Sequence, residues 1–213
     1  MINYQTLIVG SSGKGKTYGA RTLNRETTGF INAENKPLPF PGTFEHTIVP
    51  KNLSEFKTGM VALKNNPQVT HIFLDSLSAV LDMLLAEARN SKRGFDIWNF
   101  NNEEVGKILN FIKNIGKDII ITAHYEILGI EGAQEKRVKI KGKEWEGLIE
   151  KEFTVVLYAD MKVNDAGAPE YFLNLFQEGT SAKCPPNLLT EEGVFTIPND
   201  YKLIFDKIEE FRN

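Results

Sequence analysis

The sequence predicts an α/β fold, in which a mostly parallel sheet is flanked by helices and carries an antiparallel extension at its C-terminal side. Three observations predict it. Short, nearly all-apolar runs alternate with amphipathic stretches as far as residue 124. A glycine-rich turn follows the first of these runs. After residue 124 the strand-like segments follow one another, and the last two leave no room for a crossover helix.

The predicted elements follow from periodicity, taken in chain order. Buried strands are expected at 5–9, 28–33, 46–49, 70–75 and 118–123, and further strands at 137–141, 154–162 and 170–177. Helices are expected at 16–24, 52–63, 78–89, 103–115 and 200–212. In 52–63 the apolar residues Leu53, Phe56, Met60 and Leu63 recur at spacings of three and four. A polar loop with interspersed aromatic residues is expected over 90–102 and a hairpin turn at 165–167. Because no linker or repeat interrupts the pattern, we expect a single domain over 1–213.

Composition excludes several classes of protein. The 213 residues contain a single cysteine, Cys184, which excludes a disulfide framework or a zinc ribbon and suits a reducing compartment. The start of the chain lacks the features of a signal peptide, and no run is long enough for a membrane span, so we expect a soluble, cytoplasmic protein without a membrane partner. With 25 Lys and Arg against 28 Asp and Glu, any binding to a polyanion must come from a local patch.

The glycine-rich turn matches the P-loop pattern G-x-x-x-x-G-K-[ST] in full, directly after a strand and before a helix. Its backbone N–H groups and the ammonium of Lys16 are expected to hold the phosphates of ATP, and the Thr17 hydroxyl to ligate Mg²⁺. The alternative is a glycine-rich turn that binds nothing. The candidate nucleotide contacts are Gly10, Ser11, Ser12, Gly13, Lys14, Gly15, Lys16, Thr17 and Tyr18.

Three further candidates lie at the carboxyl ends of predicted strands, where ligands of parallel sheets bind. Asp75 is expected to be the second magnesium ligand, although an ordinary helix cap is the alternative. Glu34 is expected to orient or deprotonate the attacking water, and an exposed loop glutamate is the alternative. His124 is a candidate for contacting the γ-phosphate, whereas a lone histidine at a strand end is more often structural.

Together these segments resemble the core of RecA-type recombinases. The resemblance spans residues 5–183: the P-loop is followed by FINAE, then by FLDSLSAVL, then by ITAH, where that family carries a polar nucleotide sensor. The stretches GKEWEGLIEKEFTVVLYAD and TSAKCPP are similar to small RecA-like ATPases encoded by bacteriophages and grouped with single-strand annealing or recombination proteins. The resemblance implies phosphate, magnesium, water-activating and sensor roles for Lys16, Thr17, Asp75, Glu34 and His124, and places the protein in the host cytoplasm. Unlike full-length RecA, the chain has no helix and strand before its P-loop at residue 10 for recruiting a neighbouring subunit, so ring and filament both stay open.

Two basic segments are candidates for binding DNA. In the segment 136–143, KRVKIKGK, an extended strand would present cations on one face and Val138 and Ile140 on the other. It follows the sensor strand, where RecA-like proteins place a DNA-binding loop, although charge runs are often only solvated faces. In the segment 91–102, cations stand beside aromatic residues that are either stacking platforms or core residues. The candidate DNA contacts are Lys92, Arg93, Lys136, Arg137, Lys139, Lys141 and Lys143.

Lys183 follows the last predicted hairpin strand, far along the chain from its own P-loop. Basic fingers of this superfamily reach the nucleotide of a neighbouring subunit. We therefore expect Lys183 to act on the γ-phosphate of a second copy in a homo-oligomer.

The sequence thus predicts an ATPase that uses ATP and Mg²⁺ and acts on single-stranded DNA in phage recombination, with a single-stranded-DNA-binding protein as a candidate partner. One alternative is a nucleotide-switched helicase loader or accessory module. Another is a P-loop kinase for a small molecule, although the cations after the sensor strand are mostly Lys and form no arginine-rich lid.

Overall fold

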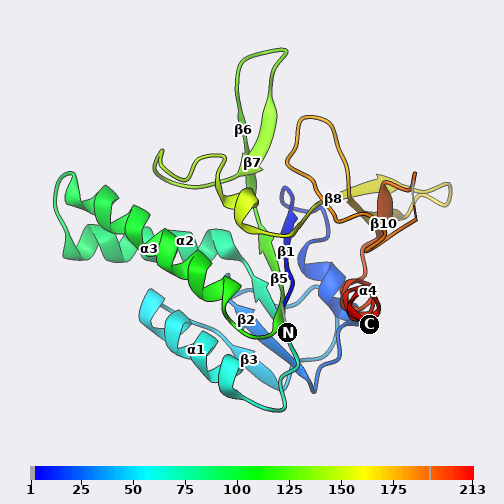
Figure 1. Cartoon of the computed structure of the whole chain (residues 1–213), viewed down its shortest axis with the longest axis horizontal. Helices are drawn as coiled ribbons and strands as arrows, with labels where there is room; N and C mark the ends of the chain where they lie inside the picture. Colours follow the sequence, from blue (N-terminus) through cyan, green and yellow to red (C-terminus); the bar gives the residue numbers. More distant parts are fainter. Residues whose placement is uncertain (1–2, 192) are drawn as a thin grey trace.

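The computed structural model describes residues 3–191 and 193–213 (Figure 1). Its centre is an eight-stranded sheet in the order β10-β9-β8-β1-β5-β4-β2-β3. The strands β1, β2, β3, β4, β5 and β8 pair in parallel, and β9 and β10 are added antiparallel at one edge. The bounds are β1 (Gln5–Val9), β2 (Thr28–Asn32), β3 (His46–Ile48), β4 (His71–Asp75), β5 (Asp118–Ala123), β8 (Val155–Val163), β9 (Pro169–Asn174) and β10 (Thr196–Pro198). The predicted fold class is confirmed.

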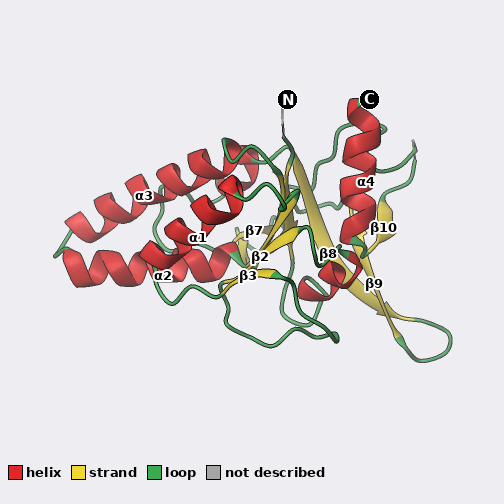
Figure 2. Cartoon of the chain, turned by 90° about the horizontal axis from the view of Figure 1, so that it is seen from below, coloured by secondary structure: helices red, strands yellow, loops and turns green. Residues whose placement is uncertain are grey.

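Helices cover both faces of this sheet (Figure 2). On one face, α1 (Leu53–Asn65), α2 (Leu77–Ser91) and α3 (Asp96–Lys113) bury their apolar sides in one core cluster. On the other face, α4 (Tyr201–Arg212) and the short 3-10 helix η1 (Thr17–Thr22) bury theirs in a second cluster. Successive side chains of a strand point to opposite faces. Both clusters therefore need strands that are apolar throughout, as the sequence shows.

A two-stranded antiparallel hairpin rises from the carboxyl edge of the sheet (Figure 1). It consists of β6 (Tyr125–Leu128) and β7 (Glu135–Val138), and only His124 separates β6 from β5. A second 3-10 helix, η2 (Ile149–Glu152), leads from the following loop into β8. The strand β6 was not predicted, because its residues lack the apolar run of the core strands.

Polar side chains cap the N-termini of three of the four α-helices in the described residues. The side chains of Asn52, Ser76 and Asp200 accept the N–H of Glu55, Ala79 and Leu203. These bonds satisfy donors that the first helical turn leaves unpaired, and they place α1, α2 and α4 within one or two residues of their predicted starts. Within the described ranges, no helix has the length and apolar character needed to cross a membrane.

Three differences between the predicted elements and the structure concern the phosphate-binding turn or the basic segments. The segment 91–102 is mostly helical, because α2 continues to Ser91 and α3 begins at Asp96. In this segment, the side chain of Phe100 packs against the first core cluster. The buried side of α3 therefore begins before residue 103, where the helix was predicted to start. The helix after the P-loop is a single 3-10 segment, since Gly19 and the β-branched Thr17 and Thr22 are weak helix formers.

The third difference lies in the basic segment, where β7 ends at Val138 rather than at residue 141. Beyond it, the N–H of Ile140 donates to a side-chain carboxylate, that of Glu126 (3.2 Å), instead of to a strand partner. Gly142 then turns the chain with a φ of 99°. The backbone hydrogen bonds between β6 and β7 therefore end before residue 141, where the predicted strand was expected to end.

Candidate functional site

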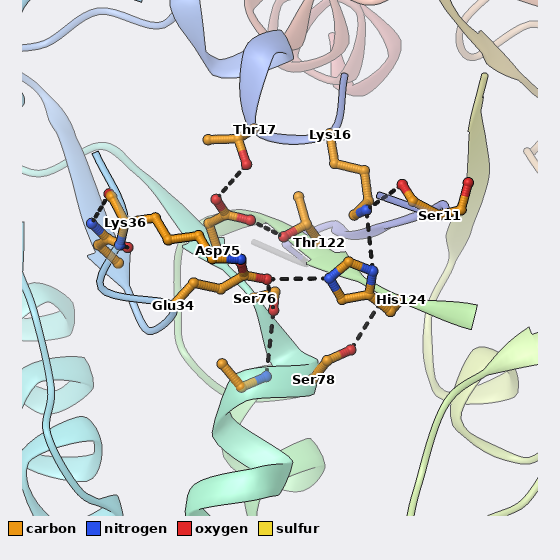
Figure 3. Close-up of polar contacts among 12 residues, drawn as sticks. Ser11, Lys16, Thr17, Glu34, Lys36, Asp75, Ser76, Ser78, Thr122 and His124 are labelled. Carbon is orange, nitrogen blue, oxygen red and sulfur yellow. Dashed lines mark hydrogen bonds and ion pairs between the residues drawn. The ribbon is translucent and has the colours of Figure 1, made fainter. Parts of the chain in front are cut away.

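The carboxyl ends of β1, β2, β4 and β5 lie side by side at one edge of the sheet. The register aligns Val9 with Ala123 and Asn32 with Asp75. The residues that follow these strands therefore meet, as ligand-binding residues do in open parallel sheets. The turn from Gly10 to Thr17, Glu34, Asp75 and His124 converge there from four separate stretches of the chain (Figure 3).

The turn after β1 has the backbone geometry of an anion-binding loop. Gly13 and Gly15 have φ of 79° and 78°, a region that residues with side chains rarely enter. A Cβ on Gly15 would lie 2.5 Å from the ring of Tyr171. Within 3–191 and 193–213, the N–H groups of residues 11–16 donate to no protein acceptor. Such a series of free N–H groups in one turn is suited to binding phosphate oxygens.

Lys16 lies inside this turn. Its ammonium donates to the carbonyl oxygens of Gly10 and Ser11, both at 2.8 Å, and lies 3.5 Å from Nδ1 of His124. The residue is buried, and this burial lowers the pKa of Lys16 to about 8 in spite of the nearby carboxylates. A phosphate would offer this desolvated ammonium a charged partner in place of two neutral carbonyls.

Asp75 is held between two hydroxyl groups. Thr17 donates to one carboxylate oxygen at 2.6 Å, and Thr122 donates to the other. Burial raises the pKa of Asp75, because the charged carboxylate loses its hydration. Its backbone also serves the site, since the carbonyl of Asp75 accepts the N–H groups of Ala33 (2.7 Å) and Glu34 (3.3 Å).

These residues fit a nucleotide with Mg²⁺. Mg²⁺ usually takes only one or two protein ligands and completes its shell with water and phosphate oxygens. Thr17 and Asp75 supply two oxygens next to the phosphate-binding turn. In the described part of the chain, His, Cys, Asp and Glu form no cluster of three that would hold a metal without a nucleotide. Two protein oxygens suit a Mg²⁺ ion that takes its other ligands from phosphate and water.

Glu34 stands opposite Lys16 and receives three hydrogen bonds. Its carboxylate accepts from Ser76 (2.9 Å) and from Lys36 (2.6 Å), and it lies 3.3 Å from Nε2 of His124. The hydrogen bond from His124, with those from Lys36 and Ser76, holds the pKa of Glu34 far below its usual range, although partial burial opposes the shift. Glu34 is therefore an ionised carboxylate beside the phosphate-binding turn.

His124 connects these groups. The imidazole ring of His124 lies between Lys16 and Glu34. The backbone N–H of His124 donates to the hydroxyl of Ser78 (2.9 Å), so both ring and backbone are fixed. Figure 3 shows the resulting chain from Lys16 through His124 to Glu34, with Asp75 and Thr17 beside it. The sequence predicted all five of these residues, but not Lys36, Ser78 and Thr122, which orient them.

Lys16, Thr17, Glu34, Asp75 and His124 line a cavity of about 540 Å³. Its lining also includes aromatic, proline and aliphatic side chains, namely Tyr18, Phe30, Pro37, Leu38, Pro39 and Tyr171. Tyr18, a predicted contact, stands 5.4 Å from Tyr171 between ring centroids. A cavity lined both by anion-binding groups and by apolar side chains suits a nucleotide, which has a charged phosphate part and an aromatic base.

Lys14 and Ser12, also predicted contacts, lie differently. Ser12 lines the cavity, whereas the ammonium of Lys14 pairs with Asp160 of β8 at 2.7 Å. This ion pair connects the turn to β8.

The predicted cationic face of the segment 136–143 is present in part. Val138 and Ile140 are buried, and Lys139, Lys141 and Lys143 are exposed, which follows the predicted alternation. Arg137 departs from the prediction, because it is half-buried and pairs with Glu135 at 2.6 Å. Lys136 lies over the ring of Tyr125, 5.3 Å from its centroid.

The second basic segment lies around the turn between α2 and α3. Lys92 and Arg93 are exposed, and the Lys92 ammonium lies 5.3 Å from the ring centroid of Phe100. Trp98 reaches the other basic segment, since a Cβ on Gly142 would lie 3.5 Å from its ring. The two candidate DNA segments are thus in contact through the first turns of α3.

Lys183 lies away from the cavity. Its backbone pairs with Val156, through N–H to O distances of 2.9 and 2.8 Å, and its exposed side chain borders a separate hollow that includes Phe176 and Phe195. Val156 in turn pairs with Leu7, three residues before the phosphate-binding turn begins. Lys183 is therefore not placed to complete the site of its own chain.

Comparisons with known proteins add the following findings. A family model described as an AAA domain matches residues 2–184. No curated protein matches the chain. Among solved structures, the KaiC-like protein PH0186 from the hyperthermophilic archaeon Pyrococcus horikoshii OT3 is similar, with 16% sequence identity, a TM-score of 0.48, and coverage of 80% of this chain and 77% of that one. The residues matched by the family model include every residue that lines the cavity.

Proposed function

The chain belongs to the AAA domain family of P-loop ATPases, and from this premise we propose that it hydrolyses ATP in response to single-stranded DNA, as a recombination protein of a bacteriophage. One observation carries the proposal. His124 lines the nucleotide cavity and also a second cavity, of about 270 Å³, whose wall includes Lys139 and Lys141. Its carbonyl oxygen accepts the N–H of Lys139 at 2.9 Å. A single residue thus adjoins both the phosphate end of the cavity and the basic segment.

The chain's own groups have distinct tasks in hydrolysis. Lys16 and the N–H groups of the turn bind the phosphates, and Thr17 and Asp75 hold Mg²⁺, which, when bound, neutralises charge on the phosphate oxygens. Glu34 is ionised and lines the same cavity as the turn, so it can orient a water molecule and accept the proton that this water releases as it attacks the terminal phosphate. His124, between Glu34 and Lys16, is placed to respond to the departure of the terminal phosphate.

The surface proposed for DNA combines charge with aromatic rings. Lys139, Lys141 and Lys143 are exposed, and Trp98 lies close to Gly142 of the same segment. Lys92 and Arg93 are exposed at the turn between α2 and α3. Cations contact the phosphates of a single strand, while rings offer stacking surfaces to unpaired bases. This combination favours a single strand over a duplex as the partner.

The proposal predicts that Lys139→Ala, Lys141→Ala and Lys143→Ala together abolish the stimulation of ATPase activity by single-stranded DNA and leave the DNA-independent rate unchanged. Three lost phosphate contacts should also make the slope of log affinity against log salt shallower by about 2. The measurements are ATPase rates with and without a DNA oligonucleotide, and fluorescence anisotropy with that oligonucleotide at several salt concentrations.

A matched control changes the same net charge elsewhere. Lys51, Lys202 and Lys207 are remote from the hairpin, and their triple alanine variant should keep full stimulation. Full stimulation of the Lys139, Lys141 and Lys143 variant would refute this DNA surface. Stable ATP binding with negligible turnover in the unmodified protein would favour a nucleotide-switched loader instead. DNA-independent phosphoryl transfer to a metabolite would favour a kinase.

We further propose that Lys183 contacts the nucleotide of a neighbouring subunit in a homo-oligomer. Its exposed position away from its own cavity supports this role. Lys183→Ala is expected to abolish turnover and to leave ATP affinity unchanged, because its ammonium would act on charge that develops during the reaction.

Mixing two inactive variants tests whether the contact is between subunits. In a mixture of Lys183→Ala and Glu34→Gln chains, about a quarter of the sites would combine an intact Glu34 with an intact neighbouring Lys183 if subunits assort at random around a ring or filament. ATPase activity should therefore reappear on mixing. If the mixture stays inactive although mixed oligomers form, or if Lys183→Ala turns over normally, Lys183 does not have this role.

A further inference from the structure

The phosphate-binding turn is supported from behind by the chain segment that begins α4. Asn199 donates from its side-chain amide to the carbonyl oxygen of Gly15 at 2.7 Å, and the hydroxyl of Tyr201 donates to the carbonyl oxygen of Lys16. Asn199 is 1% exposed and Tyr201 is fully buried. Both residues lie outside the range 2–184 that the family model matches. Nothing in the local sequence around 199–201 indicates a contact with residue 15 or 16.

The packing around these two bonds leaves little freedom. A Cβ on Gly19 would lie 2.4 Å both from the amide oxygen of Asn199 and from the ring of Tyr201. Arg21 donates to the backbone carbonyl of Asn199 at 2.7 Å, which fixes this residue from the other side. The amide oxygen of Asn199 has no hydrogen-bond partner in the described part of the chain. The Asn199 side chain therefore acts here as a hydrogen-bond donor: its NH₂ group bonds the turn, and its buried oxygen stays unpaired.

Because of the geometry of the peptide unit, these two hydrogen bonds also orient the N–H groups of the turn. In a trans peptide the C=O and the N–H point in opposite directions within one plane. The peptides of Gly15–Lys16 and Lys16–Thr17 are trans, since the described chain has a cis bond only at Asp75–Ser76. Holding the carbonyls of Gly15 and Lys16 against Asn199 and Tyr201 therefore turns the N–H groups of Lys16 and Thr17 the opposite way. Lys16 and Thr17 line the cavity.

We propose that Asn199 and Tyr201 are positioning residues that aim the N–H groups of Lys16 and Thr17 at the inner phosphate of a bound nucleoside diphosphate or triphosphate. This proposal rests on the nucleotide site proposed above. Donors that are held in place before the ligand arrives lose no conformational entropy on binding. Asn199 and Tyr201 thus belong to the nucleotide site, although neither lines the cavity.

The test uses Tyr201→Phe, which removes only the hydroxyl and keeps the ring that packs 5.6 Å from Phe73 between centroids. Loss of one buried hydrogen bond should weaken the binding of ADP, ATP and inorganic pyrophosphate by about fivefold each, as measured by titration calorimetry. Asn199→Ala should have a similar effect. Because the N–H groups contact the inner phosphate before and during the reaction, KM for ATP should rise by the same factor while kcat is retained.

Tyr158→Phe is a matched control. The buried Tyr158 also donates its hydroxyl to a backbone carbonyl, that of Lys136 at 2.9 Å, but away from the turn. This variant should lose stability to thermal unfolding to a similar extent and keep the affinity for ADP. Equal weakening of ADP binding in Tyr158→Phe would reduce the effect of Tyr201 to general destabilisation and would overturn the inference.

Two other outcomes separate this inference from the site it rests on. If Lys16→Ala loses ADP binding while Tyr201→Phe and Asn199→Ala bind ADP like the unmodified protein, the positioning role is wrong and the nucleotide site stands. If Lys16→Ala itself binds ADP normally, the nucleotide site is wrong. Tyr201→Phe decides the question alone if Asn199→Ala does not fold.

Discussion

Replacing Glu34 with Gln is expected to lower the ATPase rate by roughly a thousandfold, the range lost when a general base is removed, and to leave ATP affinity nearly unchanged. Gln has the size of Glu, and its one amide oxygen can still accept a hydrogen bond from Ser76 or from Lys36, which donate to different oxygens of Glu34, but the amide cannot take a proton from water. The residues proposed to contact the phosphates, Lys16 and the turn around it, are not altered. Steady-state rates and ATP titrations of the same preparation measure both quantities.

The control for Glu34→Gln is Glu26→Gln, since Glu26 is an exposed residue before β2 and the same charge is lost. It should hydrolyse ATP at the normal rate. An unchanged rate in Glu34→Gln would remove Glu34 from the mechanism. A loss of ATP binding together with turnover would instead make Glu34 part of the binding site, contrary to the role proposed for it.

Replacing Lys16 with Ala is expected to weaken ATP and ADP binding by about a hundredfold, which corresponds to about 2.7 kcal/mol for a charge-assisted contact. In the free protein the Lys16 ammonium is buried and bonded only to neutral carbonyls and the His124 ring, so its pKa is lowered to about 8. Binding of a phosphate gives this cation an ionic partner. The variant loses that gain, and turnover should be lost with it.

The thermal stability of Lys16→Ala distinguishes a binding effect from an unfolded protein. Because the substitution removes a desolvated charge, the nucleotide-free variant should melt close to the temperature of the unmodified protein, but added ADP should no longer raise its melting temperature. The exposed Lys51→Ala variant should keep the shift with ADP. A Lys16→Ala variant that is still stabilised by ADP would contradict the whole assignment of the turn.

The core of the site could be predicted because each residue stands at a recognisable point of the chain. Apolar strands end at Val9, Asn32, Asp75 and Ala123, and parallel strands bring such ends to one edge. The glycine pattern of the turn marks a backbone that only glycine adopts easily. Pattern and spacing are therefore sufficient to group the four residues that follow or end these strands, namely Lys16, Glu34, Asp75 and His124.

Other features were not predicted by periodicity. The segment with Phe95, Trp98 and Phe100 was compatible with a loop, but Phe100 packs against the core, Trp98 lies close to Gly142, and α3 begins at Asp96. In this case the local sequence allowed two structures, and contacts between distant segments selected one. Arg137 was expected to be a free cation, but it pairs with Glu135, two residues before it in the same strand. This contact is local, and the prediction missed it because it considered only the cations of the segment.

The sequence by itself thus determined the sheet of parallel strands, the turn that follows its first strand and the acids at neighbouring strand ends, since period, apolar runs and glycine placement act over a few residues. Only the tertiary structure decided what supports that turn: Tyr171, Asn199 and Tyr201 reach it from more than 150 residues along the chain. Asn199 and Tyr201 donate to backbone carbonyls, which every residue carries, and the ring of Tyr171 lies against Gly15, which has no side chain, so no side-chain pattern indicates these contacts.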